Sequence, residues 1–198
     1  MHSIWSRLAA AAVFTTLTAI ATSGAMAQTV EREGAKLESK LQLGGAALQL
    51  NGVGVRTRAI FKVYVAGLYV PTKSSSAAAV LAQTGPRRLS LTMLRNVDAD
   101  SFASPLNDGL QKNHSEAQLA ALKPQIDAFN AAFKAIGEAK KGDTILLEYL
   151  PETGTRIVVN GQPRSPNIAG EDFYTALLRI WLGDKPADED LKKGLLGG

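Results

Sequence analysis

Short runs of apolar residues, several of them alternating with polar side chains, recur along much of the chain. Between residues 88 and 94, Leu89, Leu91 and Met93 alternate with polar neighbours, and this period of two is typical of a strand with one buried face. Turn-forming pairs such as Asn160-Gly161 bound the runs. The predicted strands span residues 41–50, with an interruption at Gly44-Gly45, and residues 53–70, 88–94, 144–150 and 155–160.

A second set of apolar residues follows the helical spacing of three and four. One such stripe contains Leu119, Leu122, Ile126, Phe129, Phe133 and Ile136. Ser115 and Gln118 precede it at the spacing of a capping box, and Pro124 inside it predicts a kink or a break. The other predicted helices are residues 77–83, a helix that begins at Asp98 or Asp100 and runs towards Asn113, and residues 169–182 and 186–196.

The order of these elements predicts the fold class. Strands come first, then helices, then a hairpin, then helices again, without the regular strand–helix alternation of a doubly wound sheet. We therefore expect an α+β domain with a mainly antiparallel sheet and helices on one face. The charged residues 28–40 are expected to form a loose lead-in to the first strand.

Residues 1–27 have the three parts of a cleavable signal peptide. A short basic start containing Arg7 is followed by an apolar run, and Ala25-Met26-Ala27 supplies the small residues that precede a cleavage site. The run is too short and too rich in Ser and Thr for a membrane anchor. We expect cleavage before Gln28, a mature domain of residues 28–198 with no transmembrane segment, and export to the periplasm if the host is a Gram-negative bacterium.

Composition removes several classes of function. The chain has no cysteine, and His114 is the only histidine after residue 27, so we expect no metal site and no thiol chemistry. The formal charge of the mature chain is 21 − 18 = +3, with scattered basic residues, and it does not indicate nucleic-acid binding. Gly52 and Gly54 begin a dinucleotide-like motif, but Thr57 replaces its third glycine, so no cofactor is expected.

Three segments together resemble the chalcone isomerase family. They are the stretch from Leu50 to Arg56, the stretch from Phe61 to Tyr69, and residues 177–183 followed by Pro186. The similarity is greatest to the bacterial chalcone isomerase-like branch, which carries signal peptides. It implies an open-faced β-sandwich, in which a large antiparallel sheet carries a helical layer on one face with a cleft between them. In the plant enzymes the cleft closes a flavanone ring, and in non-catalytic relatives it holds a fatty acid whose carboxylate meets an arginine.

The resemblance also assigns positions to the family's functional residues. Arg56 matches the family's arginine, and Tyr64 stands at the position of a strand threonine. Phe102 replaces a helix tyrosine, Gly109 replaces a helix asparagine, and Ile180 lies near the position of a threonine or serine. Ring closure needs a network that stabilises the developing enolate, and each lost donor costs about 10²–10³ in rate. The substitutions therefore favour binding over catalysis.

The leading hypothesis is an exported protein that binds a small apolar carboxylate, such as a fatty acid, or a phenolic ligand. Arg56 would hold the charge and Tyr64 would donate a hydrogen bond, while Phe102 and Ile180 belong to an apolar wall. The further wall residues expected are Phe133, Phe173, Leu177 and Trp181. Arg58 and Lys62 share the strand face of Arg56 and could extend a cationic mouth.

Three alternatives remain open at this point. An isomerase acting on a chalcone-like unsaturated carbonyl compound would need a second polar group, for which Asn107, Asn113 and Thr92 are the candidates. An envelope interaction protein would have its cleft filled by its own side chains. A purely structural Arg56 would pair with an acid such as Glu148. The binding hypothesis also needs a turn within residues 57–60, because eight residues of straight strand would separate Arg56 from Tyr64 by about 26 Å.

Overall fold

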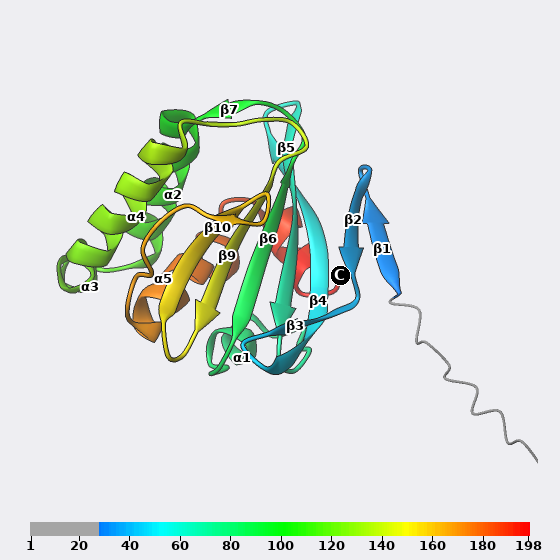
Figure 1. Ribbon diagram of the computed structural model, residues 1–198, viewed down its shortest axis with the longest axis horizontal. Helices are drawn as coiled ribbons and strands as arrows, with labels where there is room; N and C mark the ends of the chain where they lie inside the picture. The colour runs from blue at the N-terminus through cyan, green and yellow to red at the C-terminus, as the bar shows by residue number, and fades with distance from the viewer. Residues whose placement is uncertain (1–27) are drawn as a thin grey trace, which may run out of the picture.

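The computed structural model describes residues 28–198, so the predicted signal peptide lies outside the described part. A seven-stranded antiparallel sheet dominates the fold (Figure 1). Its strands span Lys40–Leu43 (β3), Ala46–Arg58 (β4), Phe61–Val70 (β5), Arg87–Met93 (β6), Thr144–Leu150 (β9), Gly154–Val159 (β10) and Gln162–Pro163 (β11). Their order across the sheet is β11-β10-β9-β6-β5-β4-β3, and every neighbouring pair is antiparallel.

The helices pack against one face of this sheet (Figure 1). They span Ala77–Leu81 (α1), Ala99–Asn113 (α2), Glu116–Ala121 (α3), Lys123–Ile136 (α4), Glu171–Leu182 (α5) and Glu189–Leu195 (α6). A large antiparallel sheet with a helical layer on one face confirms the predicted α+β class and the open-faced β-sandwich. None of the helices within residues 28–198 combines the length and the apolar character needed to cross a bilayer.

The alternation of side chains along β5 explains how the two faces are filled. Ala66 and Leu68 belong to the large core beneath the helices, whereas Val65 and Tyr69 belong to a smaller core on the other face. That smaller core is covered by a hairpin of Thr29–Arg32 (β1) and Ala35–Glu38 (β2). The expected loose lead-in over residues 28–40 is therefore wrong, because Ala35 and Leu37 are buried and hold the hairpin against the sheet.

Most local signals in the sequence are confirmed. Asp98 caps α2, and Ser115 and Gln118 form the capping box of α3. The predicted break at Pro124 separates α3 from α4, because proline is tolerated only in the first turn of a helix. The short strands Val97–Asp98 (β7) and Glu138–Ala139 (β8) pair with each other at the N-terminal end of α2.

The predicted strand over residues 53–70 is two strands joined by a tight turn. Arg58 pairs with Phe61, so that Ala59 and Ile60 alone connect β4 to β5. Ala59 has a φ of +54°, a left-handed conformation that costs a residue with a Cβ atom roughly 1–2 kcal/mol. No glycine or proline marks this turn in the sequence, so the long apolar pattern concealed it. The interruption predicted at Gly44-Gly45 is confirmed, because these two residues form the turn between β3 and β4.

Candidate functional site

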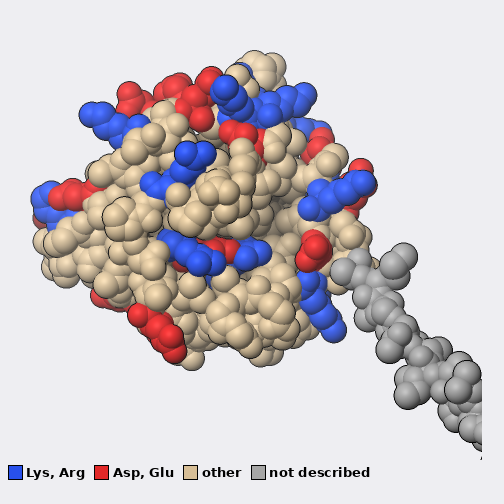
Figure 2. Space-filling view, viewed as in Figure 1, with Lys and Arg blue, Asp and Glu red and all other residues tan. Residues whose placement is uncertain are grey.

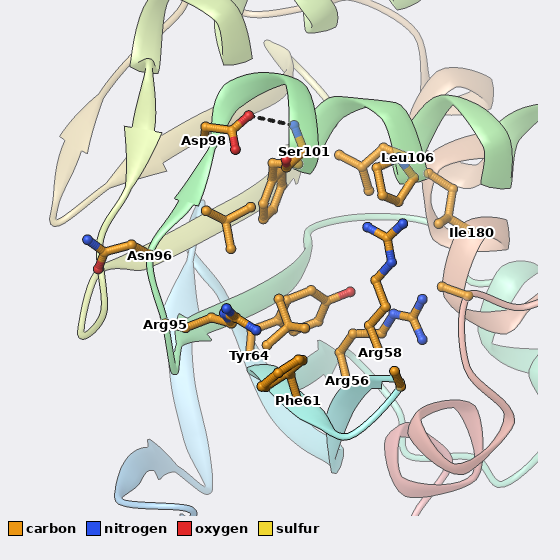
Figure 3. A pocket seen from close by; sticks show the side chains of 16 residues that line it. Arg56, Arg58, Phe61, Tyr64, Arg95, Asn96, Asp98, Ser101, Leu106 and Ile180 are labelled. Carbon is orange, nitrogen blue, oxygen red and sulfur yellow. Dashed lines mark hydrogen bonds between the residues drawn. The ribbon is translucent and has the colours of Figure 1, made fainter.

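A cavity of about 430 Å³ lies at the end of the sheet where β4 turns into β5. The β4–β5 hairpin forms one wall, residues 95–98 and the first turns of α2 form another, and α5 contributes Ile180 (Figure 3). The volume falls within the range of about 300–1,000 Å³ that is usual for small-molecule pockets. The structure therefore contains a cleft between the sheet and the helices, where the family resemblance places one.

All four residues singled out from the sequence line this cavity: Arg56, Tyr64, Phe102 and Ile180. The turn at residues 59–60 brings the first two together, because it folds the chain back so that Arg56 and Tyr64 are direct cross-strand partners. Directly opposed residues of an antiparallel pair project from the same face, with Cβ atoms about 4.5–5.5 Å apart. Their shared cavity follows from this register, while their role in ligand binding stays a prediction.

Tyr64 presents a neutral phenol to the cavity. Its side chain is buried, and its hydroxyl oxygen accepts a hydrogen bond of 2.9 Å from the indole Nε1 of Trp181. Burial raises the pKa of Tyr64 to about 12, although the Trp181 hydrogen bond and the positive charge of Arg56 oppose the shift. The hydroxyl thus keeps its proton at physiological pH. Because its oxygen is already used as an acceptor, its proton is available for donation to a ligand.

Arg56 pairs with an acidic residue, which is Asp188 and not Glu148. Its Nη1 donates to Asp188 Oδ2 at 3.2 Å and to the carbonyl oxygen of Thr57 at 2.8 Å. Glu148, the acid named in the structural alternative, instead pairs with Arg88 and Arg156 on the sheet. Arg56 therefore does pair with an acid, Asp188, while it also lines the cavity. Within residues 28–198, Nε and Nη2 of Arg56 have no hydrogen-bond partner, which leaves one edge of the guanidinium free for an anion.

Asp188 joins the end of the chain to this site. It caps α6 by accepting a hydrogen bond from the backbone N–H of Leu191 at 3.0 Å, and it accepts another from the N–H of Thr57 at 3.1 Å. Burial raises the pKa of Asp188, but these backbone hydrogen bonds and the Arg56 guanidinium outweigh burial and hold the pKa below its usual value. Asp188 is therefore a stable counter-charge that fixes one end of Arg56.

Two further arginines line the mouth of the cavity. Arg58 and Arg95 are exposed, and neither forms an ion pair within the described residues. The guanidinium of Arg95 lies over the ring of Phe61 at 4.6 Å from its centroid. Among the acids, Asp98 lines the cavity and accepts a hydrogen bond from the N–H of Ser101 at 2.9 Å as the cap of α2 (Figure 3).

The charges around the cavity sum to a positive value. The three arginines at positions 56, 58 and 95 contribute +3, and Asp98 and Asp188 contribute −2, which leaves +1. Both acids are already used as helix caps, whereas Arg58 and Arg95 are not neutralised by a partner in the described chain. Sequence reasoning included Arg58 as a possible part of the mouth but missed Arg95, which follows β6 in an irregular segment without a recognisable motif. Lys62 does not line the cavity and pairs with Glu33 at 2.8 Å.

The inner part of the cavity is apolar, but fewer aromatic residues form it than predicted. Phe102, Leu106 and Ile180 line it together with Val63 and Val97. The four other predicted wall residues do not line it and belong to the core: Phe133, Phe173, Leu177 and Trp181. Phe133 packs behind the cavity wall, because its ring stacks on the ring of Phe102 with centroids 4.9 Å apart.

The three polar residues named from the sequence as candidates for an isomerase do not line the cavity. Asn107 and Asn130 hydrogen-bond each other, and Asn113 donates to the carbonyl oxygens of Gly109 and Lys185. Thr92 is the cross-strand partner of Val65, which packs on the opposite face of the sheet. At Gly109 itself, an added Cβ would lie 2.7 Å from Ile180 Cγ2, so the close packing of α2 on α5 leaves no room for a side chain there.

Metal chemistry has no obvious ligand set in this part of the chain. Residues 28–198 contain no group of three or more His, Cys, Asp or Glu side chains arranged to hold an ion. The donors that line the cavity include guanidinium groups and a phenol, which bind anions rather than cations. The arrangement can bind an anionic group at its mouth and an apolar group further in.

Comparisons with known proteins agree with this architecture. The sequence model described as chalcone isomerase-like matches residues 29–197. The crystal structure of a fatty-acid binding protein from Arabidopsis thaliana superimposes with a TM-score of 0.65 at 14% sequence identity, over 85% of this chain and 96% of that one. At that identity the likeness establishes the fold alone. No curated protein sequence matches. The family match covers nearly all of the described residues, and the chain belongs to the chalcone isomerase-like family.

Proposed function

We propose that this protein binds a small apolar carboxylate, such as a fatty acid, in the cavity between the β4–β5 hairpin and α2, without converting it chemically. One observation carries the proposal: the neutral, buried phenol of Tyr64 and the guanidinium of Arg56, which has one edge without hydrogen-bond partners in the described chain, line the same cavity with an apolar interior. Tyr64 offers a proton that it retains up to high pH, and Arg56 offers the Nε and Nη2 edge. Together they supply the donors that a carboxylate accepts.

The energetics favour an acyl chain as the rest of the ligand. Each methylene buried against Phe102, Leu106 and Ile180 contributes about 0.8 kcal/mol. The carboxylate would stay near the mouth, where Arg58 and Arg95 add positive charge and solvent limits the desolvation cost. The comparison with a fatty-acid binding protein of the same fold supports this choice of ligand.

The two alternative functions have less support. The isomerase hypothesis required Asn107, Asn113 or Thr92 beside Arg56, and none of these three residues lines the cavity. A pure interaction protein would have its cleft filled by its own side chains, whereas about 430 Å³ is open.

We further propose that the chain is exported to the periplasm by its signal-peptide-like residues 1–27. Mass determination of the protein recovered from a periplasmic extract tests this, with a new N-terminus at Gln28 as the expected result.

Calorimetric titration with laurate and with its neutral methyl ester tests the binding function. We expect laurate to bind more tightly than the ester, and the double variant Arg58→Gln, Arg95→Gln to weaken laurate binding about tenfold while leaving the ester unchanged. Arg164→Gln, which removes an exposed cation from outside the cavity, is the matched control. Equal binding of laurate and ester, or no binding of either, would contradict the proposal.

A further variant tests whether the ligand occupies the apolar interior of the cavity, independently of the charged groups at its mouth. Leu106→Trp places a larger side chain in the apolar interior and should abolish the binding of both laurate and its ester. Because overpacking typically costs about 1–3 kcal/mol, thermal unfolding must show that the variant is folded before its binding is interpreted. A folded Leu106→Trp protein that binds laurate as the parent does would place the ligand elsewhere.

A further inference from the structure

The turn between β4 and β5 exposes its apolar side chains to an unusual degree. Ile60 is 85% exposed and Phe61 is 53% exposed, and the only other exposed large hydrophobic residue within residues 28–198 is Val30, at 40%. Phe61 lines the mouth of the cavity, but Ile60 does not line it and packs into neither core. The folded domain therefore offers no internal reason for an isoleucine at this tip.

Basic side chains surround this apolar tip. Arg58 and Lys62 flank it in sequence, and Arg95 lies against Phe61 from the neighbouring segment. Figure 2 shows Lys and Arg side chains at the end of the molecule where the β4–β5 turn lies, with Asp and Glu side chains beside them. Only Lys62 among the three has an acidic partner in the described chain, and that pair is itself exposed. An apolar tip with unpaired cations around it is complementary to an anionic lipid surface, into which apolar side chains insert while the cations meet head groups.

The size of the tip distinguishes a lipid surface from a protein partner. A stable protein interface buries about 1,200–2,000 Å² in total, which requires a broad surface on each partner. A two-residue turn cannot supply such an area, whereas binding to a lipid surface scales with the inserted apolar area plus the attraction of basic residues to anionic lipids, so that a small tip gives weak, reversible attachment. The position of the turn adds a second argument, because Arg58, Ala59 and Phe61 form part of the cavity mouth.

We propose that the β4–β5 turn docks the protein on an anionic lipid surface by inserting Ile60, and that the ligand passes between that surface and the cavity at this mouth. Docking would bring the open end of the cavity to the depth of the lipid head groups, so that an acyl carboxylate need not cross bulk water. The docking step does not depend on the proposed function. Only the identity of the transferred ligand, an apolar carboxylate, rests on the proposed function.

Sedimentation with phospholipid vesicles tests the docking step. The parent protein should bind vesicles that contain phosphatidylglycerol much more strongly than vesicles of phosphatidylcholine alone, and added salt should weaken that binding. Ile60→Ser should weaken binding about tenfold, and Arg58→Gln and Arg95→Gln should weaken it about fivefold each. Val30→Ser removes an exposed apolar side chain from β1, outside the turn, and serves as the matched control. All variants are prepared with the same N-terminus, so differences in vesicle binding between them arise from the substituted residues and not from the N-terminal segment.

A fluorescence measurement places the tip directly. In the variant Ile60→Trp of the chain that begins at Gln28, which lacks Trp5, the emission of the introduced indole should shift to the blue and be quenched by brominated phosphatidylglycerol, against the background of Trp181, which is 1% exposed. Ile60→Ser should leave laurate binding in solution unchanged, because Ile60 does not line the cavity. Equal sedimentation of the parent and Ile60→Ser, or an unshifted and unquenched indole, would overturn docking through this turn. Loss of laurate binding in solution would refute the proposed function and leave the docking result unaffected.

Discussion

Replacing Asp188 by asparagine should tighten the binding of a carboxylate, although it removes an ion pair. Asp188 holds Nη1 of Arg56 at 3.2 Å, and the side chains of the two residues are only 14% and 20% exposed. A ligand carboxylate on the free edge of the same guanidinium would lie about 5–6 Å from the Asp188 carboxylate. With an effective dielectric constant near 20, the repulsion at that distance is about 3 kcal/mol, and exposure and salt reduce it to about 1–2 kcal/mol.

The affinity of laurate should therefore rise about five- to thirtyfold in Asp188→Asn, and the affinity of methyl laurate should not change. Asparagine caps a helix as well as aspartate does, so α6 should keep its N-terminal cap. Calorimetric titration of both ligands provides the measurement, and thermal unfolding checks that the fold is retained.

The variant Arg56→Gln, Asp188→Asn completes the test without leaving an unpaired charge. It should lose the gain in laurate affinity and bind laurate more weakly than the parent, because the guanidinium itself is gone. If Asp188→Asn leaves laurate affinity unchanged, the carboxylate does not lie beside Arg56, and the assignment of the anion-binding edge is wrong.

Three further predictions concern the residues around this pair. Tyr64→Phe removes the acceptor of the Trp181 indole N–H, so the free energy of unfolding measured in urea should fall by about 1–3 kcal/mol. The same change removes the hydroxyl that would donate to the ligand, so the affinity for laurate should fall about tenfold. Gly109→Ala should destabilise the fold by about 1–3 kcal/mol in the same assay, because its Cβ would lie 2.7 Å from Ile180 Cγ2; an unchanged midpoint would show that α2 and α5 can separate. Because the pKa of Tyr64 is about 12, laurate affinity should be level from about pH 7 to about pH 10, and a decrease in that range would indicate an ionising phenol.

The lowered pKa of Asp188 predicts the direction of acid sensitivity. A carboxyl group with a lower pKa in the folded state stabilises the fold above its unfolded pKa of about 3.9, and this contribution is lost as the pH falls through the folded value. The urea midpoint should therefore decrease below about pH 4, and it should decrease less in Asp188→Asn. Identical pH profiles for the two proteins would contradict the assignment.

The fold could be predicted because its signals are local. Caps at Asp98 and Ser115, the break at Pro124 and the period-two runs all depend on residues within one turn or one strand. The family resemblance then supplied the arrangement in space. The β4–β5 turn escaped detection because Ala59 adopts a positive φ without the glycine that usually marks it. Its presence could be inferred only from the requirement that Arg56 and Tyr64 meet.

The electrostatic partners in the site could not be predicted in the same way. Asp188 lies 132 residues from Arg56 in the chain, and nothing in the local pattern of either residue links them. Glu148 was a reasonable candidate acid, but the register of the sheet places it opposite Arg88 and Arg156. The apolar wall was overestimated for a related reason, since helical spacing identifies the buried face of a helix but not the part of that face beside a void.

The most direct test of the account is the carboxyl resonance of laurate labelled with ¹³C at its carboxyl carbon, followed during a pH titration with the protein. We predict a separate bound resonance that remains ionised well below the pKa of free laurate, because the Arg56 guanidinium and the Tyr64 hydroxyl stabilise the charged form. We also predict contacts between the ligand and the rings of Tyr64 and Phe102. A bound carboxyl that titrates as it does in water, or the absence of any bound resonance, would contradict the central claim.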